Sequence, residues 1–192
     1  MKKVAILASG SGSNAQNIAE YFSDSQKVKV ELILSNNSDA YVLERAKQLE
    51  IRSGVFNRNT FYHQEVVVDL MHELDIDLVV LAGFLWLIPE NLIKAFPNRI
   101  INIHPALLPK YGGKGMYGDR VHQAVIESGD QVSGITIHYV NEKYDEGQII
   151  FQGECPVDKA DTPDSLARKI HALEYKYFPR VIEDVLDDLN YR

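Results

Sequence analysis

The chain has 192 residues, and its 27 acidic and 20 basic side chains give a formal net charge of −7, which offers no electrostatic reason to expect nucleic acid or an anionic membrane as partner. With 45% hydrophobic and 24% charged residues, the composition predicts a globular protein, and the length suits a single domain over residues 1–192. One cysteine, Cys155, excludes an intrachain disulfide and a zinc site of several cysteines, and so favours a reducing, cytoplasmic location.

The first residues resemble a targeting signal only superficially. Lys2 and Lys3 precede five apolar residues, 4–8, whereas a secretory signal needs about 7 to 15. No other stretch approaches the roughly 18 apolar residues of a membrane span. We therefore expect a chain without a targeting or membrane segment.

The first half of the chain alternates short β-branched runs with segments of helical period. The expected strands are 4–7, 28–34, 54–56, 78–82 and 100–103. The expected helices are 14–22, 41–49, 61–74 and 89–96. Strands that alternate with helices need crossover connections, which predicts a parallel sheet covered on both faces.

The pattern changes after His104. Residues 105–118 contain two prolines and four glycines, which indicates a long loop. The remaining expected elements are a helix over 120–127, strands over 132–139 and 148–157, and a helix over 163–189 that Pro179 should break. The predicted fold class is thus α/β, with a single doubly wound, mostly parallel sheet, helices on both faces and a late antiparallel extension.

A glycine-rich loop follows the first strand and leads directly into a helix. It reads Ser-Gly-Ser-Gly-Ser-Asn over residues 9–14. Backbone N–H groups at a helix N-terminus favour a phosphate. A dinucleotide is less favoured, because the second strand ends in Leu34-Ser35-Asn36-Asn37 without the acidic partner of that fingerprint. The alternative is a tight turn that Ser13 or Asn14 caps without any ligand.

Asn102 and His104 point to one face of the fifth strand, because side chains alternate along a strand. They also lie at its carboxyl end, where open α/β sheets place their ligands. If the polar loop between the two late strands folds over this end, Asp145 reaches His104 and raises the pKa of the histidine. The alternative is an Asn–His pair that satisfies its own hydrogen bonds in a packed core.

The other histidines and the cysteine receive structural interpretations. His63 and His72 lie in an expected surface helix, and His122 and His138 are expected to have structural roles. Cys155 is interpreted as a small core residue, since no activating motif surrounds it. The spacing supports no metal site.

Five segments together form a known pattern. Asn-Ile-His-Pro-Ala-Leu-Leu-Pro at 102–109, Gly-Ile-Thr-Ile-His-Tyr-Val-Asn-Glu at 134–142 and Tyr-Asp-Glu-Gly at 144–147 resemble the formyltransferases that use 10-formyltetrahydrofolate. The opening loop at 9–14 and His-Ala-Leu-Glu at 171–174 are similar to the branch that acts on phosphoribosylglycinamide. The resemblance covers nearly the whole chain.

The resemblance implies an enzyme of purine biosynthesis that moves the formyl group of 10-formyltetrahydrofolate, its co-substrate, to the amine of phosphoribosylglycinamide. It implies small-molecule partners, no nucleic acid, no membrane, no metal, and a monomer or homodimer. Relatives that act on tRNA or hydrolyse the folate carry an additional domain, which 192 residues do not accommodate. The alternatives are a hydrolase-like enzyme of the same family and a non-catalytic phosphate-sensing α/β domain.

The resemblance also carries site residues over to this chain. It implies a catalytic trio of Asn102, His104 and Asp145. For the phosphate and ribose it implies Gly12, Ser13, Asn14, His171 and Glu174. For the folate it implies Arg58, Leu85, Trp86, Leu87, Ile88, Asn102, Val140, Asn141, Glu142, Lys143, Tyr144 and Asp145, with a solvated loop arginine as the alternative for Arg58. The chain departs from the family in its longer glycine loop, 111–118, and in Trp86, where many members have arginine.

Overall fold

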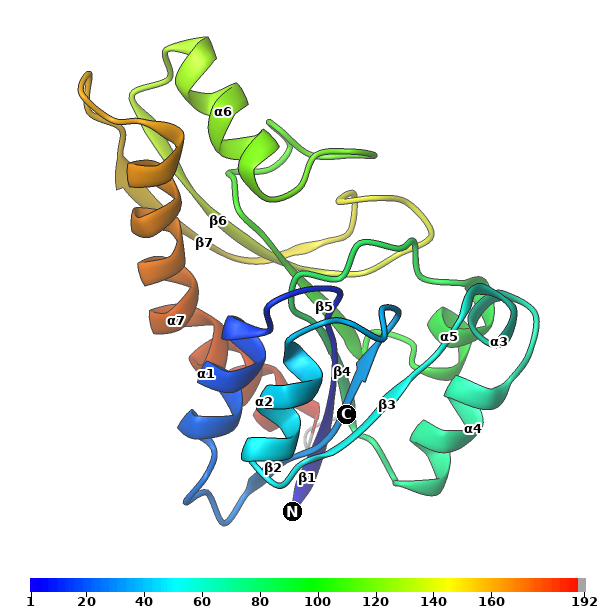
Figure 1. Ribbon diagram of the computed structural model, residues 1–192. Coiled ribbons are helices and arrows are strands. Elements are labelled where there is room, and N and C mark those ends of the chain that lie inside the picture. Colours follow the sequence, from blue (N-terminus) through cyan, green and yellow to red (C-terminus); the bar gives the residue numbers. More distant parts are fainter. Residues whose placement is uncertain (190–192) are drawn as a thin grey trace.

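A single sheet runs through the centre of the computed structural model, which describes residues 1–189 (Figure 1). Within those residues the sheet has seven strands in the order β3-β2-β1-β4-β5-β6-β7. The strands are β1 (Lys2–Leu7), β2 (Val28–Ser35), β3 (Arg52–Val55), β4 (Leu78–Leu81), β5 (Ile100–His104), β6 (Val132–Tyr139) and β7 (Ile149–Pro156). The last three residues of the predicted domain, 190–192, lie outside the described part.

Strands β1 to β5 are mutually parallel, whereas β6 pairs antiparallel with β5 and β7 pairs antiparallel with β6. The helices are α1 (Ser13–Tyr21), α2 (Val42–Gln48), α3 (Arg58–Tyr62), α4 (Val66–Glu73), α5 (Glu90–Ala95), α6 (Asp119–Ser128) and α7 (Pro163–Asp188). The predicted fold class, a mostly parallel doubly wound sheet with a late antiparallel extension, is confirmed.

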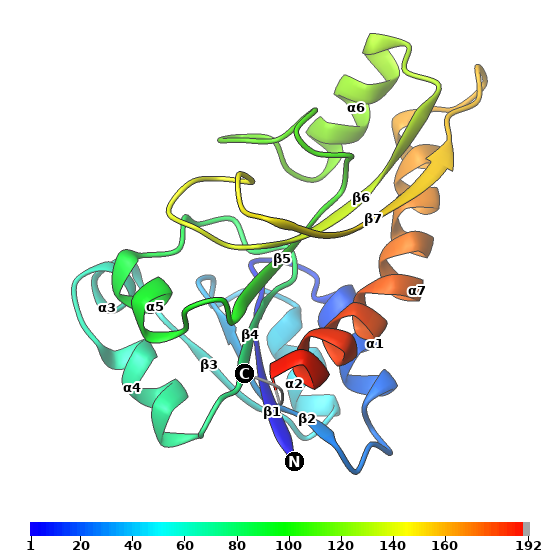
Figure 2. The same ribbon diagram turned by 180° about the vertical axis from the view of Figure 1, so that it is seen from behind.

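Two hydrophobic layers hold the helices to the sheet. Helices α1, α2 and α7 cover one face, and α3, α4 and α5 cover the other (Figures 1 and 2). Strand β4 shows how the sheet contributes to both layers. Leu78 and Val80 pack into the first layer, beneath α1, α2 and α7, while Val79 and Leu81 pack into the second, beneath α3, α4 and α5. A strand buried on both faces must be apolar at every position, which is why this run lacks polar alternation.

The strand order reverses between β1 and β4. The chain leaves β1 toward β2 on one side, and it leaves β4 toward β5 on the other. The two connections separate at this point and leave a crevice at the carboxyl ends of the strands. Ser9 joins its two edges, because its N–H donates to the carbonyl of Gly83 (3.0 Å) and its Oγ accepts from the N–H of Leu85 (3.0 Å).

The single helix expected over 61–74 is wrong. The structure has two helices there, α3 and α4, and residues 63–65 separate them. Helix α3 begins at Arg58, three residues before the expected helix, because Asn57 caps it: the Asn57 side chain accepts from the N–H of Thr60 while the Thr60 hydroxyl accepts from the N–H of Asn57 (both 3.0 Å). This reciprocal cap satisfies two backbone donors at once and stabilises a short helix.

The break expected at Pro179 is also wrong, because α7 continues through it to Asp188. Proline has no N–H to donate to the carbonyl four residues earlier, that of Tyr175. In this protein the side chain of Asn17 on α1 donates to that carbonyl instead (3.0 Å). A tertiary contact therefore compensates for the hydrogen bond that proline removes. No helix among residues 1–189 is long and apolar enough to cross a membrane.

Candidate functional site

A cavity of about 560 Å³ opens at the carboxyl edge of the sheet. Its walls come from the loops after β1 and β4, the end of β5, the 105–118 loop, α6, the β6–β7 connection and α7. It brings together many residues that the sequence nominated, namely Gly12, Ser13, Asn14, Leu85, Asn102, His104, Tyr144, Asp145, His171 and Glu174. Side chains far apart in the sequence thus share one space.

The glycine loop enters α1 through a left-handed residue, Gly12, with φ of 72°. The turn is also crowded, because a Cβ at this position would come within 2.8 Å of the Cα of Val42. The N–H of Val42 in turn donates to the carbonyl of Gly10 (3.1 Å), which fixes the loop against α2. The sequence requires glycine here for the backbone itself as well as for any ligand.

We expect Gly12→Ala to lower the free energy of unfolding by about 2 to 4 kcal/mol, because it adds left-handed strain to a clash with a buried neighbour. Urea denaturation measures the loss. Gly10→Ala is the matched control, since nothing lies within 4 Å of a Cβ added there. Equal stability of the two variants would contradict the role assigned to the turn.

The α7 side of the cavity presents a buried carboxyl group. Glu174 is 6% exposed, and its Oε2 accepts a hydrogen bond from Nδ2 of Asn14 (2.9 Å). Burial raises the pKa of Glu174, although the bond from Asn14 and the charge of His171 act in the opposite direction. Within residues 1–189, Oδ1 of Asn14 is buried without a hydrogen-bond partner. The amide oxygen of Asn14 and the carboxyl group of Glu174 are therefore both held beside the 9–14 loop.

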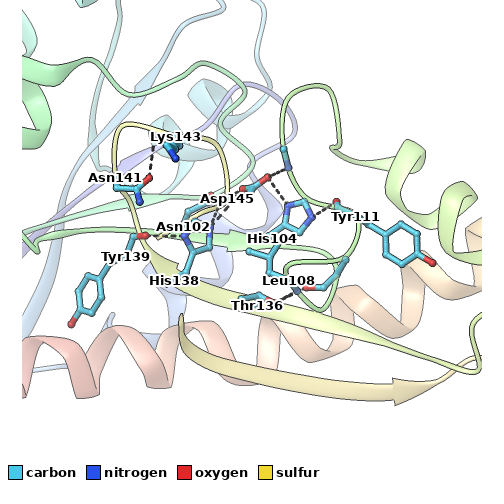
Figure 3. A network of polar contacts seen from close by, with 12 residues as sticks. Asn102, His104, Leu108, Tyr111, Thr136, His138, Tyr139, Asn141, Lys143 and Asp145 are labelled. Atoms are coloured by element: carbon cyan, nitrogen blue, oxygen red, sulfur yellow. Dashed lines mark hydrogen bonds and ion pairs between the residues drawn. The ribbon is translucent and has the colours of Figure 1, made fainter. Parts of the chain in front are cut away.

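The predicted catalytic trio lies together in the same cavity, and Figure 3 shows Asp145 above the ends of Asn102 and His104. Nδ1 of His104 is 3.6 Å from Oδ2 of Asp145. Nδ2 of Asn102 is 3.5 Å from Oδ1 of the same carboxylate. The hypothesis that the late loop folds over β5 and brings Asp145 to His104 agrees with this geometry.

The electrostatic prediction for His104 is wrong in its net direction. Asp145 raises the pKa of the histidine, as expected, but burial has the larger effect and lowers the pKa below its ordinary value. The ring is only 3% exposed. For Asp145, burial raises the pKa, but His138, His104 and the N–H of Gly113 together outweigh it and hold the pKa below its ordinary value. Burial therefore favours the neutral imidazole of His104, whereas the donors around Asp145 favour its charged carboxylate.

His138 was assigned a structural role from the sequence, yet it belongs to this polar network. It lies directly opposite Asn102 across the β5–β6 pair. Its Nδ1 donates to the carbonyl of Tyr139 (2.8 Å), so in the neutral ring Nε2 accepts from Nδ2 of Asn102 (3.1 Å). His138 therefore orients the amide of Asn102. Only the cross-strand register could have indicated this contact.

The 111–118 loop and α6 supply further lining residues that sequence reasoning missed. Lys114, Met116 and Tyr117 line the cavity from the loop. His122, on α6, is 3% exposed, and no hydrogen-bond partner for its Nδ1 lies within the described chain. Burial, followed by the charge of His171, lowers the pKa of His122. The absence of an apolar period in 105–118 indicated a loop but not where its side chains point.

The structure does not bring every predicted folate residue to this cavity. Outside its lining lie Arg58, Trp86, Leu87, Ile88, Val140, Asn141, Glu142 and Lys143. Ile88 is 3% exposed and packs into the second core layer, so its side chain is committed to the fold. Trp86 packs among Phe56, Phe61, Tyr62 and Phe84, and the guanidinium of Arg58 lies 4.7 Å from its ring centre.

The sequence also predicts that Cys155 is a core residue and that no metal site is present. Cys155 is buried in the first core layer, which confirms its assignment as a core residue. Burial raises the pKa of its thiol, which disfavours the reactive thiolate. Across the described chain, no group of three or more His, Cys, Asp or Glu side chains is arranged to hold a metal ion.

Comparisons with known proteins agree with the geometry. Residues 2–182 match the formyl transferase family. The chain is 42% identical to the chloroplastic phosphoribosylglycinamide formyltransferase of Arabidopsis thaliana, covering 97% of this chain and 66% of that protein, and so spans just under two thirds of its length. It is 38% identical to the phosphoribosylglycinamide formyltransferase of Haemophilus influenzae, covering 95% and 86% of the two chains. The crystal structure of the enzyme of that name from Streptococcus pneumoniae superposes with a TM-score of 0.84 at 39% identity, covering 97% and 99%.

Proposed function

The chain belongs to the formyl transferase family, and from this premise we propose that it transfers the formyl group of 10-formyltetrahydrofolate to the amine of phosphoribosylglycinamide, a step of purine biosynthesis. One observation carries the proposal. A single cavity joins a glycine loop at a helix N-terminus, which suits a phosphate, to an Asn–His–Asp cluster, which suits acyl transfer. The names of the relatives support the choice of substrate.

The phosphate end of the substrate is assigned to Gly12, Ser13 and Asn14. The N–H groups that begin α1 have no helical partner and can donate to phosphate oxygens. His171 and Glu174 line the same end of the cavity, and we assign them to the phosphate and the ribose. A carboxylate that accepts from ribose hydroxyls suits the buried position of Glu174.

The folate is assigned to the opposite side of the cavity, along Leu85–Ile88 and the connection 140–145. Of these residues, Leu85, Tyr144 and Asp145 line the cavity. Because the side chain of Ile88 is committed to the core, its contribution would come from the backbone. Arg58 and Trp86 stack on one another at the outer end of this side, and we propose that Arg58 there faces the glutamate of the folate.

The proposed reaction begins with attack of the substrate amine on the formyl carbon. A C–N bond forms, and the formyl oxygen takes up the electron pair of its double bond, which gives a tetrahedral intermediate. The amine proton then passes, by way of Asp145 and His104 or water, to the folate nitrogen. The electron pair on oxygen re-forms the C=O bond as the bond between the formyl carbon and that nitrogen breaks, which releases tetrahydrofolate and leaves the formyl group on the amine. Donors aimed at the charged oxygen make the largest contribution in reactions of this class.

His104 and Asn102 are the proposed donors. Nε2 of His104 donates to the carbonyl of Tyr111 (2.8 Å), so donation to the oxyanion requires protonation at Nδ1, beside the Asp145 carboxylate. The amide of Asn102 directs one hydrogen at Nε2 of His138 and the other at Asp145, over a long 3.5 Å contact. A developing oxyanion can replace that weak contact. No covalent enzyme intermediate is needed.

The function is tested by mixing the protein with 10-formyltetrahydrofolate and following the release of tetrahydrofolate. We expect slow release with folate alone and fast release after phosphoribosylglycinamide is added, because the amine is the nucleophile. Rapid release that ignores the amine would instead support the hydrolase alternative. No release under either condition, with both ligands bound, would support the phosphate-sensing alternative.

The remaining assignments follow from the same proposal. The partners are two small molecules, with no metal, and the state of the protein is a monomer or homodimer. We place the reaction in the cytoplasm, since a chain with one buried cysteine suits a reducing compartment. The plant relatives are named as chloroplastic proteins.

A further inference from the structure

Tyr111, at the start of the 111–118 loop, contacts His104 through its backbone. Its carbonyl oxygen lies 2.8 Å from Nε2 of His104 (Figure 3). A carbonyl can only accept, so Nε2 carries a proton whenever this contact forms. The proton position in the neutral ring is then set, and Nδ1 is left unprotonated toward Asp145.

The backbone of Tyr111 is unusual. Its φ is 57°, in the left-handed region that a residue with an aromatic side chain rarely adopts. Such a conformation persists only where surrounding contacts enforce it. Here those contacts come from the side chain, because the ring packs against the first core layer and the phenol oxygen is hydrogen-bonded at its far end.

The phenol is anchored at the end of α6. Its oxygen lies 2.6 Å from Oγ of Ser128, the last residue of that helix, and 2.9 Å from Oδ2 of Asp130. Lys110 completes the anchor, since its Nζ lies 2.9 Å from the same Asp130 oxygen. The anchor residues lie outside the lining of the cavity, yet they hold the residue whose carbonyl contacts His104.

The same segment also contacts Asp145. Two residues after Tyr111, the N–H of Gly113 donates to Oδ2 of Asp145 (2.9 Å), the oxygen that faces Nδ1 of His104. Gly112 between them allows the close approach, because a Cβ there would lie 2.6 Å from the side chain of Leu108 and 3.3 Å from that of Asp145. One short piece of backbone, 111–113, therefore holds both members of the His104–Asp145 pair.

We propose that Tyr111 is a positioning residue: its anchored phenol holds the 111 carbonyl on Nε2 of His104, which fixes that nitrogen as the protonated one and reserves Nδ1, beside Asp145, for the proton that moves during the reaction. The effect on catalysis rests on the proposed function, whereas the effect on the ring does not. Without the anchor the neutral ring is free to carry its proton at Nδ1 instead. The ring would then have to exchange its proton before it could accept one beside Asp145.

Two variants remove the anchor from opposite sides. Tyr111→Phe deletes the phenol oxygen and keeps the ring, and Asp130→Ala deletes the half-buried carboxylate partner. We expect each to reduce kcat roughly three- to tenfold, the loss that corresponds to one hydrogen bond, with little change in KM. The double variant should lose no more than Tyr111→Phe alone, because that variant already removes the contact between the phenol and Asp130. Tyr21→Phe is the matched control, since it also deletes a phenol–carboxylate bond (Glu183, 3.1 Å), at the end of α1 remote from the cavity.

The second readout is the state of the His104 ring, from proton–nitrogen correlation spectra of the ligand-free protein, with the signals assigned by their loss in His104→Ala. A pH series separates them from the titration of the neighbouring groups, which are Asp145 on the β6–β7 connection, His138 on β6 and His122 on α6. We expect the neutral ring to be protonated at Nε2 in the unmodified protein and in Tyr21→Phe. Both anchor variants should show an additional form protonated at Nδ1.

The proposal requires both readouts to change together. It is overturned if the unmodified neutral ring is protonated at Nδ1, or if the anchor variants keep the normal ring signals, even with reduced kcat. It is also overturned if the ring signals change while kcat does not. Failure of the proposed function is distinct, since it would leave the unmodified protein without formyl transfer while the spectra still report the ring.

Discussion

Replacing His104 by alanine is expected to reduce kcat on the order of 10² to 10³-fold, the cost of deleting one donor to a developing oxyanion. KM should change much less, because the contact strengthens only in the transition state. Steady-state kinetics with both substrates saturating measure the effect. His72→Ala is the control, since this exposed histidine on α4 stacks on Phe96 and lies outside the cavity. Equal loss in both variants would contradict the assignment.

Asp145→Asn tests the coupling within the pair. It keeps an oxygen that can accept from the N–H of Gly113, but it removes the charge that raises the pKa of His104. Activity that begins from neutral His104 is lost as pH falls through the histidine's pKa. In Asp145→Asn this acid limb should shift to lower pH, since burial then acts unopposed by the carboxylate. The double variant should lose less than the sum of the single losses, because the two residues act as a unit. Full additivity in folded variants would mean that no such coupling exists.

Asn14→Asp is expected to weaken binding of phosphoribosylglycinamide by about 10²-fold or more, since like charges placed in direct contact cost several kcal/mol. The amide it replaces donates to Glu174 at 2.9 Å, so the variant sets two carboxyl groups against one another in a buried place. It also adds negative charge beside a phosphate that carries roughly −1.5 to −2. Binding of the folate should be nearly unchanged, which calorimetric titration with each ligand can establish.

The control for this variant is Gln16→Glu. It makes the same exchange of amide for carboxylate two residues further along α1, where the side chain contacts Arg45 and not Glu174. The deficit of Asn14→Asp should also shrink at lower pH, because two adjacent carboxyl groups readily share one proton. Equal losses for both ligands would show that the variant damages the fold instead of the phosphate end.

Much of the fold could be predicted from local pattern. The buried runs of β1, β2, β4 and β5 are short, apolar and β-branched, so they identify themselves as strands of a covered parallel sheet. Pro179 shows where local rules fail. The residue does remove a helical hydrogen bond, but Asn17 replaces it from another helix, and no pattern around position 179 contains that information.

The residues of the site likewise divide into those that local sequence pattern predicts and those that it does not. Asn102 and His104 could be paired from the alternation of one strand, and the family motif added Asp145. His138 could not be recognised, because its contact with Asn102 depends on the register of β6 against β5, which forms across a 27-residue connection. The sequence indicated a carboxylate beside His104 but not the extent of burial. Since burial outweighs the carboxylate, the direction of the histidine's pKa could not be predicted from neighbours alone.

The bond from Asn17 to Tyr175 has a consequence for the ligand as well as for the helix. Asn14 and Asn17 are one turn apart on α1, and they bond to adjacent residues of α7, Glu174 and Tyr175. The two helices are therefore fastened together at the cavity before any ligand arrives. If a phosphate binds there, as we propose, its protein partners would already be held in place, so the protein would lose little conformational entropy at that end on binding.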